Sequence, residues 1–381
     1  MSIPTHRRQL AAILATLVMC ASVLFYTYGR GLSAKSVPAE LNDREFWRLV
    51  DDFSEPNGYF RSDNLLSNEN AFQHVIPTLQ TSLPAEGVYL GVGPEQNFTY
   101  IAALRPKLAF IVDIRRGNMN LQLLYKAFME LSRDRADFLS RLFARPRPTN
   151  LNEKTPVDEM LDAYELSSPS DELYQHNLQE ASDHLTKVHK FGLTPDDLRG
   201  LDYVYGAFFK AGPDLNYSFS GGPFGGGFRF PTYSSLMTET DGRGEHRSYL
   251  ATEANYRIVR EMEMHNAIVP ITGDFAGPKA LRSLGRYLKD HDATVTAIYT
   301  SNVEQYLFQS DTNWKKYYQN VGTLPIDAKT TFIRSVSNRG IQGARGGFLR
   351  AQTRLCSVAD LLRAFNRGQI NTYVDVIAMS K

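Results

Sequence analysis

The chain has few cysteines and no excess of charge of either sign. Two cysteines occur in 381 residues, Cys20 in an apolar segment and Cys356 far from it. One cysteine in the rest of the chain can form neither an intradomain disulfide nor a multi-cysteine zinc site. The 42 basic and 41 acidic side chains give a net charge of +1. Long-range attraction of nucleic acid is therefore not expected.

Motifs for metal binding and for nucleophilic catalysis are missing as well. The eight histidines are scattered, and no pair forms an H-E-x-x-H pattern, so the sequence does not indicate a metal. No G-x-S-x-G nucleophile elbow occurs, nor does an internal repeat or a low-complexity tract. What remains is a chain of ordinary globular composition, long enough for one elaborated domain or two.

Residues 9–29 form an apolar segment of 21 residues without a charge, which is enough for a helix to cross a hydrocarbon core of about 30 Å. Basic side chains in residues 1–8 predict a cytoplasmic N-terminus, with the remainder outside the cytoplasm. Alternatively, residues 1–34 are a cleaved signal sequence, and the protein is then secreted or periplasmic. In the first case the helix anchors the chain in the membrane, and residues 30–41 are a linker.

The rest of the chain alternates between short apolar runs and patterns of helical period. Helices are expected at 42–53, around 72–80, from 94 to about 103, at 277–291 and at 357–370. Strands are expected at 87–93, 108–114, 266–275, 294–302, 330–336 and 373–379. The strand at 87–93, the helix from 94 and the strand at 108–114 follow one another within 30 residues, which predicts a right-handed parallel crossover. The pattern predicts an α/β fold with a doubly wound, mostly parallel sheet.

A long helical stretch interrupts this alternation. Residues 118–264 repeat apolar side chains every three or four positions, so they are expected to form a helical cap inserted between two parts of a Rossmann-like domain, 42–117 and 265–381. The insertion contains a glycine-rich loop, 218–237, which lacks the Gly-Lys-Ser/Thr ending of a phosphate-binding loop. This loop is either a lid near the site or a flexible surface loop.

Polar residues follow the predicted strands at the edge where ligands of parallel sheets bind. Gly91 and Gly93 form a turn after the first strand, and Asp113 ends the second, in the position from which an acidic residue can bind ribose hydroxyls. Glu95 replaces the third glycine of a dinucleotide motif, and a carboxylate there disfavours pyrophosphate. The structural alternatives are a simple tight turn for the glycines, and for Asp113 a cap or an ion pair with a following arginine.

The glycine turn, the acidic strand end and the Gly-Asp pair at 273–274 together resemble the class I S-adenosylmethionine-dependent methyltransferase fold, over about 60–118 and 266–381. The stretches "FSEPNGYFRSDNLLSNE" and "GDFAGPKAL" also resemble a bacterial family of unknown function with such a domain. The resemblance implies S-adenosylmethionine as the cofactor. It implies that the glycine turn holds the methionine part, Asp113 the ribose and Asp274 the adenine amine, with Phe275 beside the ring.

Further candidates lie beside these positions. Asn97 follows the glycine turn, and Asn68 and Glu69 precede the first strand, where a segment could close over the cofactor or simply start a helix. Asn302 and Glu304 follow the fourth strand and are candidates for substrate contact or proton removal, with a helix cap and a solvated glutamate as the alternative.

Two functions therefore remain open. The first is S-adenosylmethionine-dependent methylation of an unknown acceptor. The second is a non-catalytic, membrane-associated or exported protein with a degenerate fold of this kind that binds a ligand or partner. Tyr89, which stands where the methyltransferases usually have an acidic residue, favours the second function. A small molecule is the expected ligand in the first case.

Overall fold

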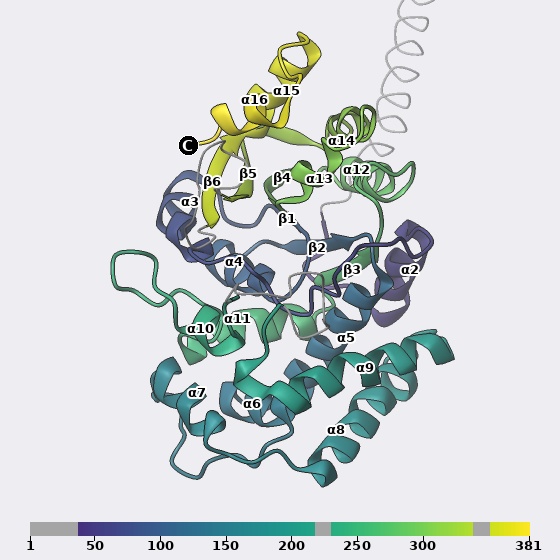
Figure 1. Cartoon of the computed structure of the whole chain (residues 1–381). Helices are drawn as coiled ribbons and strands as arrows, with labels where there is room; N and C mark the ends of the chain where they lie inside the picture. Colours follow the sequence, from purple (N-terminus) through teal and green to yellow (C-terminus); the bar gives the residue numbers. More distant parts are fainter. Residues whose placement is uncertain (1–36, 218–229, 338–350) are drawn as a thin grey trace, which may run out of the picture.

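The computed structural model describes residues 37–217, 230–337 and 351–381 (Figure 1). The predicted membrane or signal segment, 9–29, lies outside these residues, as do positions 218–229 of the glycine-rich loop. Among the helices that are described, none is both long enough and apolar enough to span a bilayer.

A six-stranded sheet forms the centre of the molecule, in the order β3-β2-β1-β4-β5-β6. Neighbouring strands from β3 to β5 pair in parallel, and β6 is antiparallel to β5. The prediction of an α/β fold with a mostly parallel sheet is confirmed. The strands are β1 (Val88–Gly91), β2 (Leu108–Asp113), β3 (Ile268–Thr272), β4 (Val295–Ser301), β5 (Ile326–Ser337) and β6 (Ala351–Ser357).

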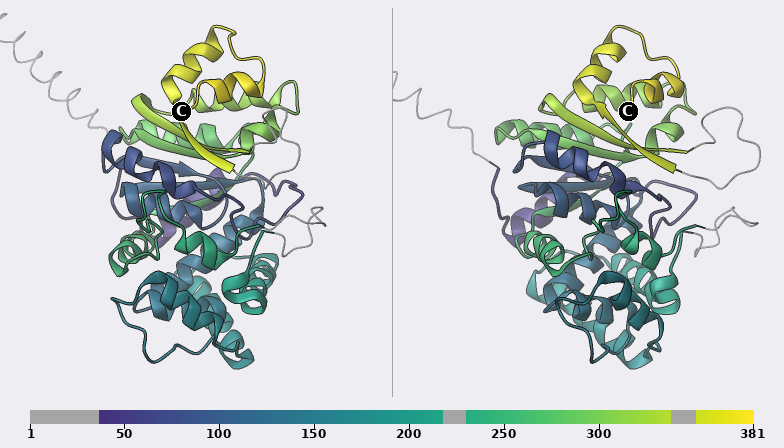
Figure 2. Two further views of the ribbon diagram at one scale, coloured as in Figure 1. Left: turned by 60° about the vertical axis from the view of Figure 1, so that its left-hand side comes forward. Right: turned by 90° about the vertical axis from the view of Figure 1, so that its left-hand side faces the viewer.

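Helices cover both faces of this sheet (Figure 2). Every residue of β1, β2 and β3 is buried, which explains why these strands appear in the sequence as continuous apolar runs and not as alternating ones. One face carries α4 (Gln96–Leu104), α5 (Arg116–Leu131) and α11 (Glu253–Met264). The other carries α12 (Ala280–Asp290), α13 (Val303–Leu307), α14 (Asn313–Val321) and α15 (Val358–Asn366).

The segment before β1 supplies three shorter elements. Helix α2 (Asp43–Phe53) packs against β3 and α12, at the edge of the sheet. The 3-10 turn η1 (Phe72–Val75) continues into α3 (Ile76–Ser82), which packs against α4. Helices were predicted at both places.

The long stretch between β2 and β3 is helical, and most of it forms a further layer beneath α5, away from the sheet (Figure 1). Helix α9 begins as expected, with Pro195 in its first turn and a capping box between Thr194 and Asp197. Arg116 Nη2, at the start of α5, lies 2.8 Å from Asp197 Oδ2 and so fastens this layer to the sheet. The layer consists of α6 (Arg135–Phe143), α7 (Val157–Glu165), α8 (Asp171–Asp183), η2 (His184–Val188), α9 (Pro195–Ala211), η3 (Gly212–Asp214) and α10 (Tyr233–Thr238).

The prediction for the C-terminus is wrong in one respect. Residues 373–379 were expected to form the last strand, but they contain helix α16 (Tyr373–Ala378). Thr372 and Asp375 form a capping box that starts this helix, and local capping outweighs the strand preference of its apolar residues. The sixth strand is β6, an edge strand in which Cys356 is the buried residue, so it has no apolar run that could reveal it.

Candidate functional site

A pocket opens beyond the carboxyl ends of β1, β2, β3 and β4, where the strand order reverses direction between β1 and β4. Open α/β sheets bind their ligands at such a crevice. The space between its walls is about 830 Å³, including the part that opens to solvent. The segment before β1 and Tyr217, which follows η3 in the helical layer, complete the walls.

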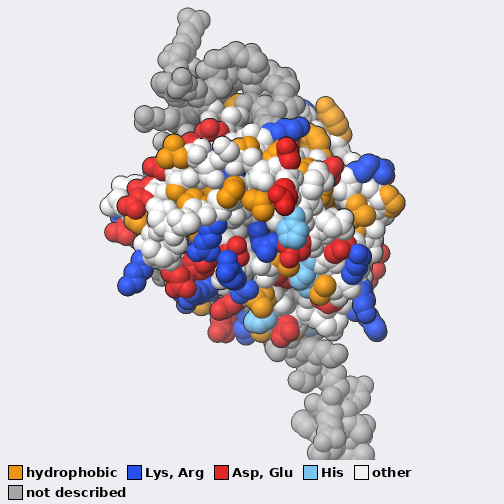
Figure 3. Space-filling model, turned by 90° about the horizontal axis from the view of Figure 1, so that it is seen from below, with side chains coloured by type: hydrophobic (Ala, Val, Ile, Leu, Met, Phe, Trp, Pro, Cys, Tyr) orange, Lys and Arg blue, Asp and Glu red, His pale blue; other side chains and the backbone are white. Residues whose placement is uncertain are grey.

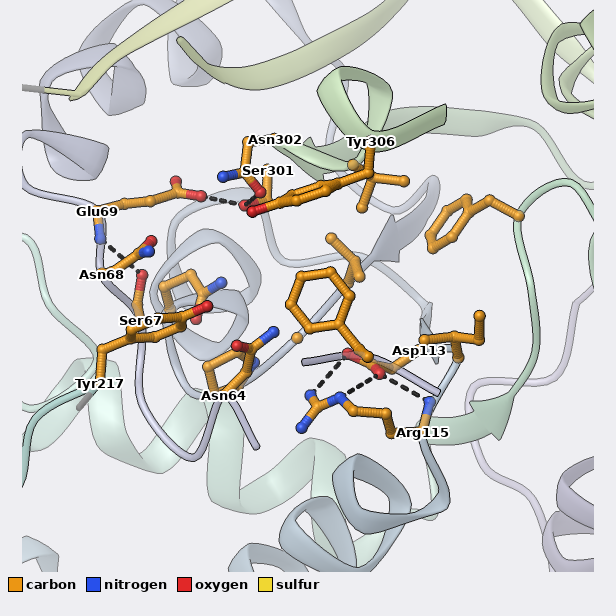
Figure 4. Close-up of a pocket in the computed structure, with 18 of the residues that line it drawn as sticks. Asn64, Ser67, Asn68, Glu69, Asp113, Arg115, Tyr217, Ser301, Asn302 and Tyr306 are labelled. Atoms are coloured by element: carbon orange, nitrogen blue, oxygen red, sulfur yellow. Dashed lines mark hydrogen bonds and ion pairs between the residues drawn. The ribbon is translucent and has the colours of Figure 1, made fainter. Parts of the chain in front are cut away.

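Most of the predicted site residues meet in this pocket, although they come from five separate parts of the chain (Figure 4). The carboxyl group of Asp113 lies at one end, and Glu69 and Asn302 lie together at the other. The pocket thus has two polar ends. The predicted residues that line it are Asn68, Glu69, Gly93, Asp113, Asp274, Phe275 and Asn302.

Gly91 and Asn97 are placed differently, because they shape the turn without lining the pocket. Asn97 Nδ2 donates to the carbonyl of Pro94 at 2.8 Å, and Asn97 Oδ1 accepts from the hydroxyl of Tyr89 at 2.8 Å. A Cβ on Gly91 would lie 2.0 Å from Asn97 Oδ1, and Gly93 has a φ of +81°, in the left-handed region. Both glycines are therefore required by the turn.

Asp113 is engaged by its neighbour Arg115. The carboxylate accepts hydrogen bonds from the Arg115 backbone N at 2.9 Å and from the Nε and Nη2 of its guanidinium at 3.2 Å each. Both side chains are nearly buried and both line the pocket. The ion pair that the sequence left open is present, and it occupies three of the roughly four acceptor positions of the carboxylate.

Asp274 closes a local turn and does not cap the next helix. Its Oδ1 accepts from the backbone N of Ala276 at 2.8 Å, and the side chain is half-buried. The start of α12 is capped from far away in the sequence, because Glu55 Oε1 accepts from the backbone N of Lys279 at 2.8 Å and of Ala280 at 2.9 Å. Glu55, and not Asp274, therefore caps α12.

Glu69 is a buried carboxyl group at the other end of the pocket. The hydroxyl of Ser301 donates to its Oε1, while Oε2 has no hydrogen-bond partner among residues 37–217, 230–337 and 351–381. Burial raises the pKa of Glu69 to about 7. Asn302 lies next to Ser301, so this end combines a hydroxyl, an amide and a carboxyl group that exchanges its proton near neutral pH.

Glu95, at the start of α4, is fully buried behind the glycine turn and does not line the pocket. Burial raises its pKa to about 8, and its Oε1 accepts a hydrogen bond from the backbone N of Ser67 at 3.4 Å. Glu95 is therefore mainly a neutral acid at pH 7. Repulsion of phosphate requires an ionised side chain, so a neutral Glu95 does not disfavour pyrophosphate as the sequence suggested.

Glu304 is turned away from the pocket, which corrects its proposed role in proton removal. It is buried against Arg334 of β5, which holds both carboxylate oxygens, with 3.1 Å between Arg334 Nη2 and Glu304 Oε1. The hydroxyl of Tyr318 donates to the same oxygen at 2.7 Å. Arg334 also donates to Ser380 Oγ at 3.1 Å, so the cluster joins the loop after β4 to the C-terminal end of the chain.

Aromatic side chains that the sequence did not single out form much of the wall. Phe60 and Tyr306 meet edge to face, with their ring centroids 5.1 Å apart, and Tyr217 comes from the segment that follows η3. Phe60 follows a Pro-Asn-Gly turn, and Tyr306 lies in α13. The local sequence pattern does not predict that these residues line a pocket, because they reach it only when distant segments converge in the folded chain.

Two amide side chains in the pocket wall also lack partners for their oxygens. Asn64 Oδ1 and Gln96 Oε1 are buried and accept no hydrogen bond from the described part of the chain. Gln96 Nε2 donates to Tyr299 OH at 2.9 Å, which fixes the orientation of that amide. An unpaired buried acceptor costs free energy, so a donor supplied by a bound molecule would stabilise this wall.

Comparison with known proteins gives one family. A family model described as "Domain of unknown function (DUF7790)" matches residues 65–193 and 229–360, more than half of the chain. The matched segments include all of the predicted site residues. No curated protein matches the chain.

Proposed function

The chain belongs to this family of unknown function, and from its pocket we propose that it binds S-adenosylmethionine and methylates an acceptor. One observation carries the proposal. Gly93, Asp113 and the pair Asp274 and Phe275 follow three different strands and converge on one pocket, at the reversal point of the strand order. The methyltransferase resemblance implies this set, and the general rule for open sheets places a ligand there.

The residues present fit the proposed cofactor in most respects. The backbone of the glycine turn, with no side chain at Gly93, permits close approach of a ligand. Phe275 offers an apolar ring, and Asp274 retains acceptor capacity for an amine. Asp113 has room for about one further donor, so binding both ribose hydroxyls requires it to release at least one bond to Arg115.

Glu69 replaces Glu304 as the candidate for proton transfer. S-adenosylmethionine supplies an activated methyl group, and an acceptor that carries a proton must lose it to a base. A pKa of about 7 suits a group that takes up and releases protons near neutral pH. Ser301 and Asn302 lie beside Glu69 and would orient the acceptor.

A second function is favoured by the Asp113–Arg115 ion pair, because this carboxylate is already neutralised by the protein. The protein would then be a non-catalytic ligand-binding protein, anchored by residues 9–29 or exported. S-adenosylmethionine is a cytoplasmic metabolite, so the location of the globular part separates the two functions. A reporter fused to the C-terminus tests it, since a cytoplasmic signal supports the enzyme and an external signal supports the alternative.

The direct test is calorimetric titration of the purified full chain with S-adenosylmethionine and S-adenosylhomocysteine. We expect both to bind, and Asp113→Ala to weaken binding by about 10-fold or more, since hydrogen bonds to a charged group contribute roughly 1.5–3 kcal/mol. The matched control is Asp158→Ala, an exposed aspartate of α7, which should bind as the wild type does. Absence of heat at millimolar ligand would contradict the proposal.

A further inference from the structure

A second cluster of ionisable side chains lies in the helical layer, outside the pocket. Nε2 of His184 and Nε2 of His189 each lie 2.6 Å from Oε2 of Glu130. The three potential ligand atoms lie within 4.8 Å of one another. We propose that His184, His189 and Glu130 form a binding site for a divalent transition-metal ion, with zinc as the best fit.

The backbone is shaped so that the two histidines meet. Residues five apart on an α-helix point about 140° away from each other. Here α8 ends in the π-helical turn η2, closed by a bond from the backbone N of His189 to the carbonyl of His184 at 3.0 Å. This wider turn brings both rings to one side, with centroids 4.7 Å apart. Such turns occur frequently at functional sites.

The ring of His189 is held as metal-binding histidines usually are. Its Nδ1 lies 2.7 Å from Oδ1 of Asp43 in α2, and the ring stacks on Phe191 at a centroid distance of 4.9 Å. A carboxylate on the second ring nitrogen fixes the tautomer and leaves the Nε2 lone pair for the ion. Asn266 Nδ2 donates to the same oxygen of Asp43 at 3.0 Å and so orients this carboxylate.

The two carboxylate oxygens of Glu130 have different partners, and only Oε2 contacts the histidines. Lys126 Nζ lies 2.7 Å from the other oxygen, Oε1, and also donates to the carbonyl of Glu263. The positive charge of Lys126 would repel a metal ion. The carboxylates of Glu130 and Asp43, which contact the histidines, would attract it. The cluster is thus divided into a lysine side and a histidine side.

The donor set determines which ion fits. Two imidazoles and one carboxylate, completed by water, form a tetrahedral set that zinc adopts, whereas magnesium and calcium prefer oxygen ligands alone. Binding requires each Nε2 to give up any proton that it shares with Glu130. The side chains of His184, His189 and Glu130 are 18%, 12% and 7% exposed, so the site lies just below the surface. Figure 3 shows histidine side chains on the lower face, among charges of both signs.

Such an ion would fasten parts of the chain that are distant in sequence. Glu130 belongs to the end of α5, the histidines to η2 and the residue that follows it, and Asp43 to α2 at the sheet edge. Because the site exists only in the folded protein, the ion stabilises the fold by mass action. The ion would thus stabilise the fold at a place separate from the ligand pocket.

The test uses the full chain, purified without a polyhistidine tag and stripped of metal. Cobalt(II) is the spectroscopic probe and zinc the calorimetric one. We expect one ion per chain, with the intense visible absorption of four-coordinate cobalt, and a higher melting temperature with zinc. The proposal is overturned if the wild-type chain shows neither the cobalt absorption nor any heat of zinc binding at millimolar ion.

Variants then locate the site. His184→Gln and His189→Gln should each weaken zinc binding at least 100-fold, and Asp43→Asn by about 10- to 100-fold, as for other outer carboxylates. His176→Gln is the matched control, because this histidine of α8 is 69% exposed and lies outside the cluster. Unchanged binding in both cluster variants, or equal loss in the control, contradicts the assignment.

Discussion

At the scale of single residues, Gly91 and Glu95 show how closely the turn after β1 is fitted. Gly91 lies against the amide of Asn97, and Glu95 is enclosed without a charged partner. Few other side chains would therefore fit at either position.

Gly91→Ala should destabilise the protein. The added Cβ would lie 2.0 Å from Asn97 Oδ1, so the amide that holds the turn must shift, and overpacking of this kind costs roughly 1–3 kcal/mol. Gly117→Ala is the control, because a Cβ in this part of α5 meets nothing within 4 Å. There the change should stabilise the chain by about 0.5–1 kcal/mol. Urea unfolding of both variants measures the difference, and equal effects would show that the turn is not tightly packed.

Glu95→Gln should alter the pH dependence of stability. The pKa of Glu95 is raised by burial from 4.5 to about 8, so between these values the folded chain keeps a proton that the unfolded chain loses. Its contribution to stability is therefore largest below pH 4.5 and falls as the pH rises to about 8. Glutamine resembles the neutral acid, so the variant should lose stability less steeply over this range.

The measurement is the free energy of unfolding in urea at several values between pH 5 and pH 9. Glu159→Gln, an exposed glutamate of α7, is the control and should follow the wild type. Glu69 and Glu263 also have pKa values raised by burial, to about 7 and about 8, so the slope should decrease without vanishing. A slope identical to that of the wild type would show that Glu95 is ionised in the folded chain.

At the scale of elements, the buried pair of Glu304 and Arg334 connects α13 with β5. Glu304→Ala leaves a buried guanidinium without its partner, and we expect a loss of roughly 3–5 kcal/mol in the free energy of unfolding. The exposed pair of Glu153 and Arg257 is the comparison, because Glu153→Ala should cost at most about 1 kcal/mol. Urea unfolding tests both.

The same variant separates a structural role of Glu304 from a catalytic one. Where Glu304→Ala still folds, ligand binding in the pocket should remain within a few-fold of the wild type, since the side chain does not reach the pocket. A large loss of binding or methyl transfer in a stably folded variant would restore Glu304 as a site residue.

Local sequence patterns predict the buried elements well and the connections between distant residues poorly. The central strands were recognisable because burial on both faces makes them continuously apolar, whereas β6 is polar along most of its length and lies at an edge. The strand ends that converge on the pocket were predictable from parallel topology alone. Glu55 and Arg334 were not recognised, since their partners lie 225 and 30 residues away.

The histidine cluster illustrates the same limit. A spacing of five residues does not match an α-helical face, and only the π-helical turn brings the two rings together. Glu304 illustrates the converse, because its position after a strand suggested chemistry while its surroundings are those of the core. Position in the sequence indicates which edge of the sheet a residue occupies, but not where its side chain points.

At the scale of the whole molecule, β2 and β3 are neighbours in the sheet, yet the entire helical stretch is synthesised between them. A ribosome therefore releases β1 and β2 long before β3 and β4 exist to flank them. Helices depend on contacts close in sequence and form quickly, whereas this parallel pairing must wait for a distant segment. During synthesis α4 and α5 are thus the first helices able to cover one face of β1 and β2, and they would shield these apolar strands from aggregation until the second part of the sheet arrives.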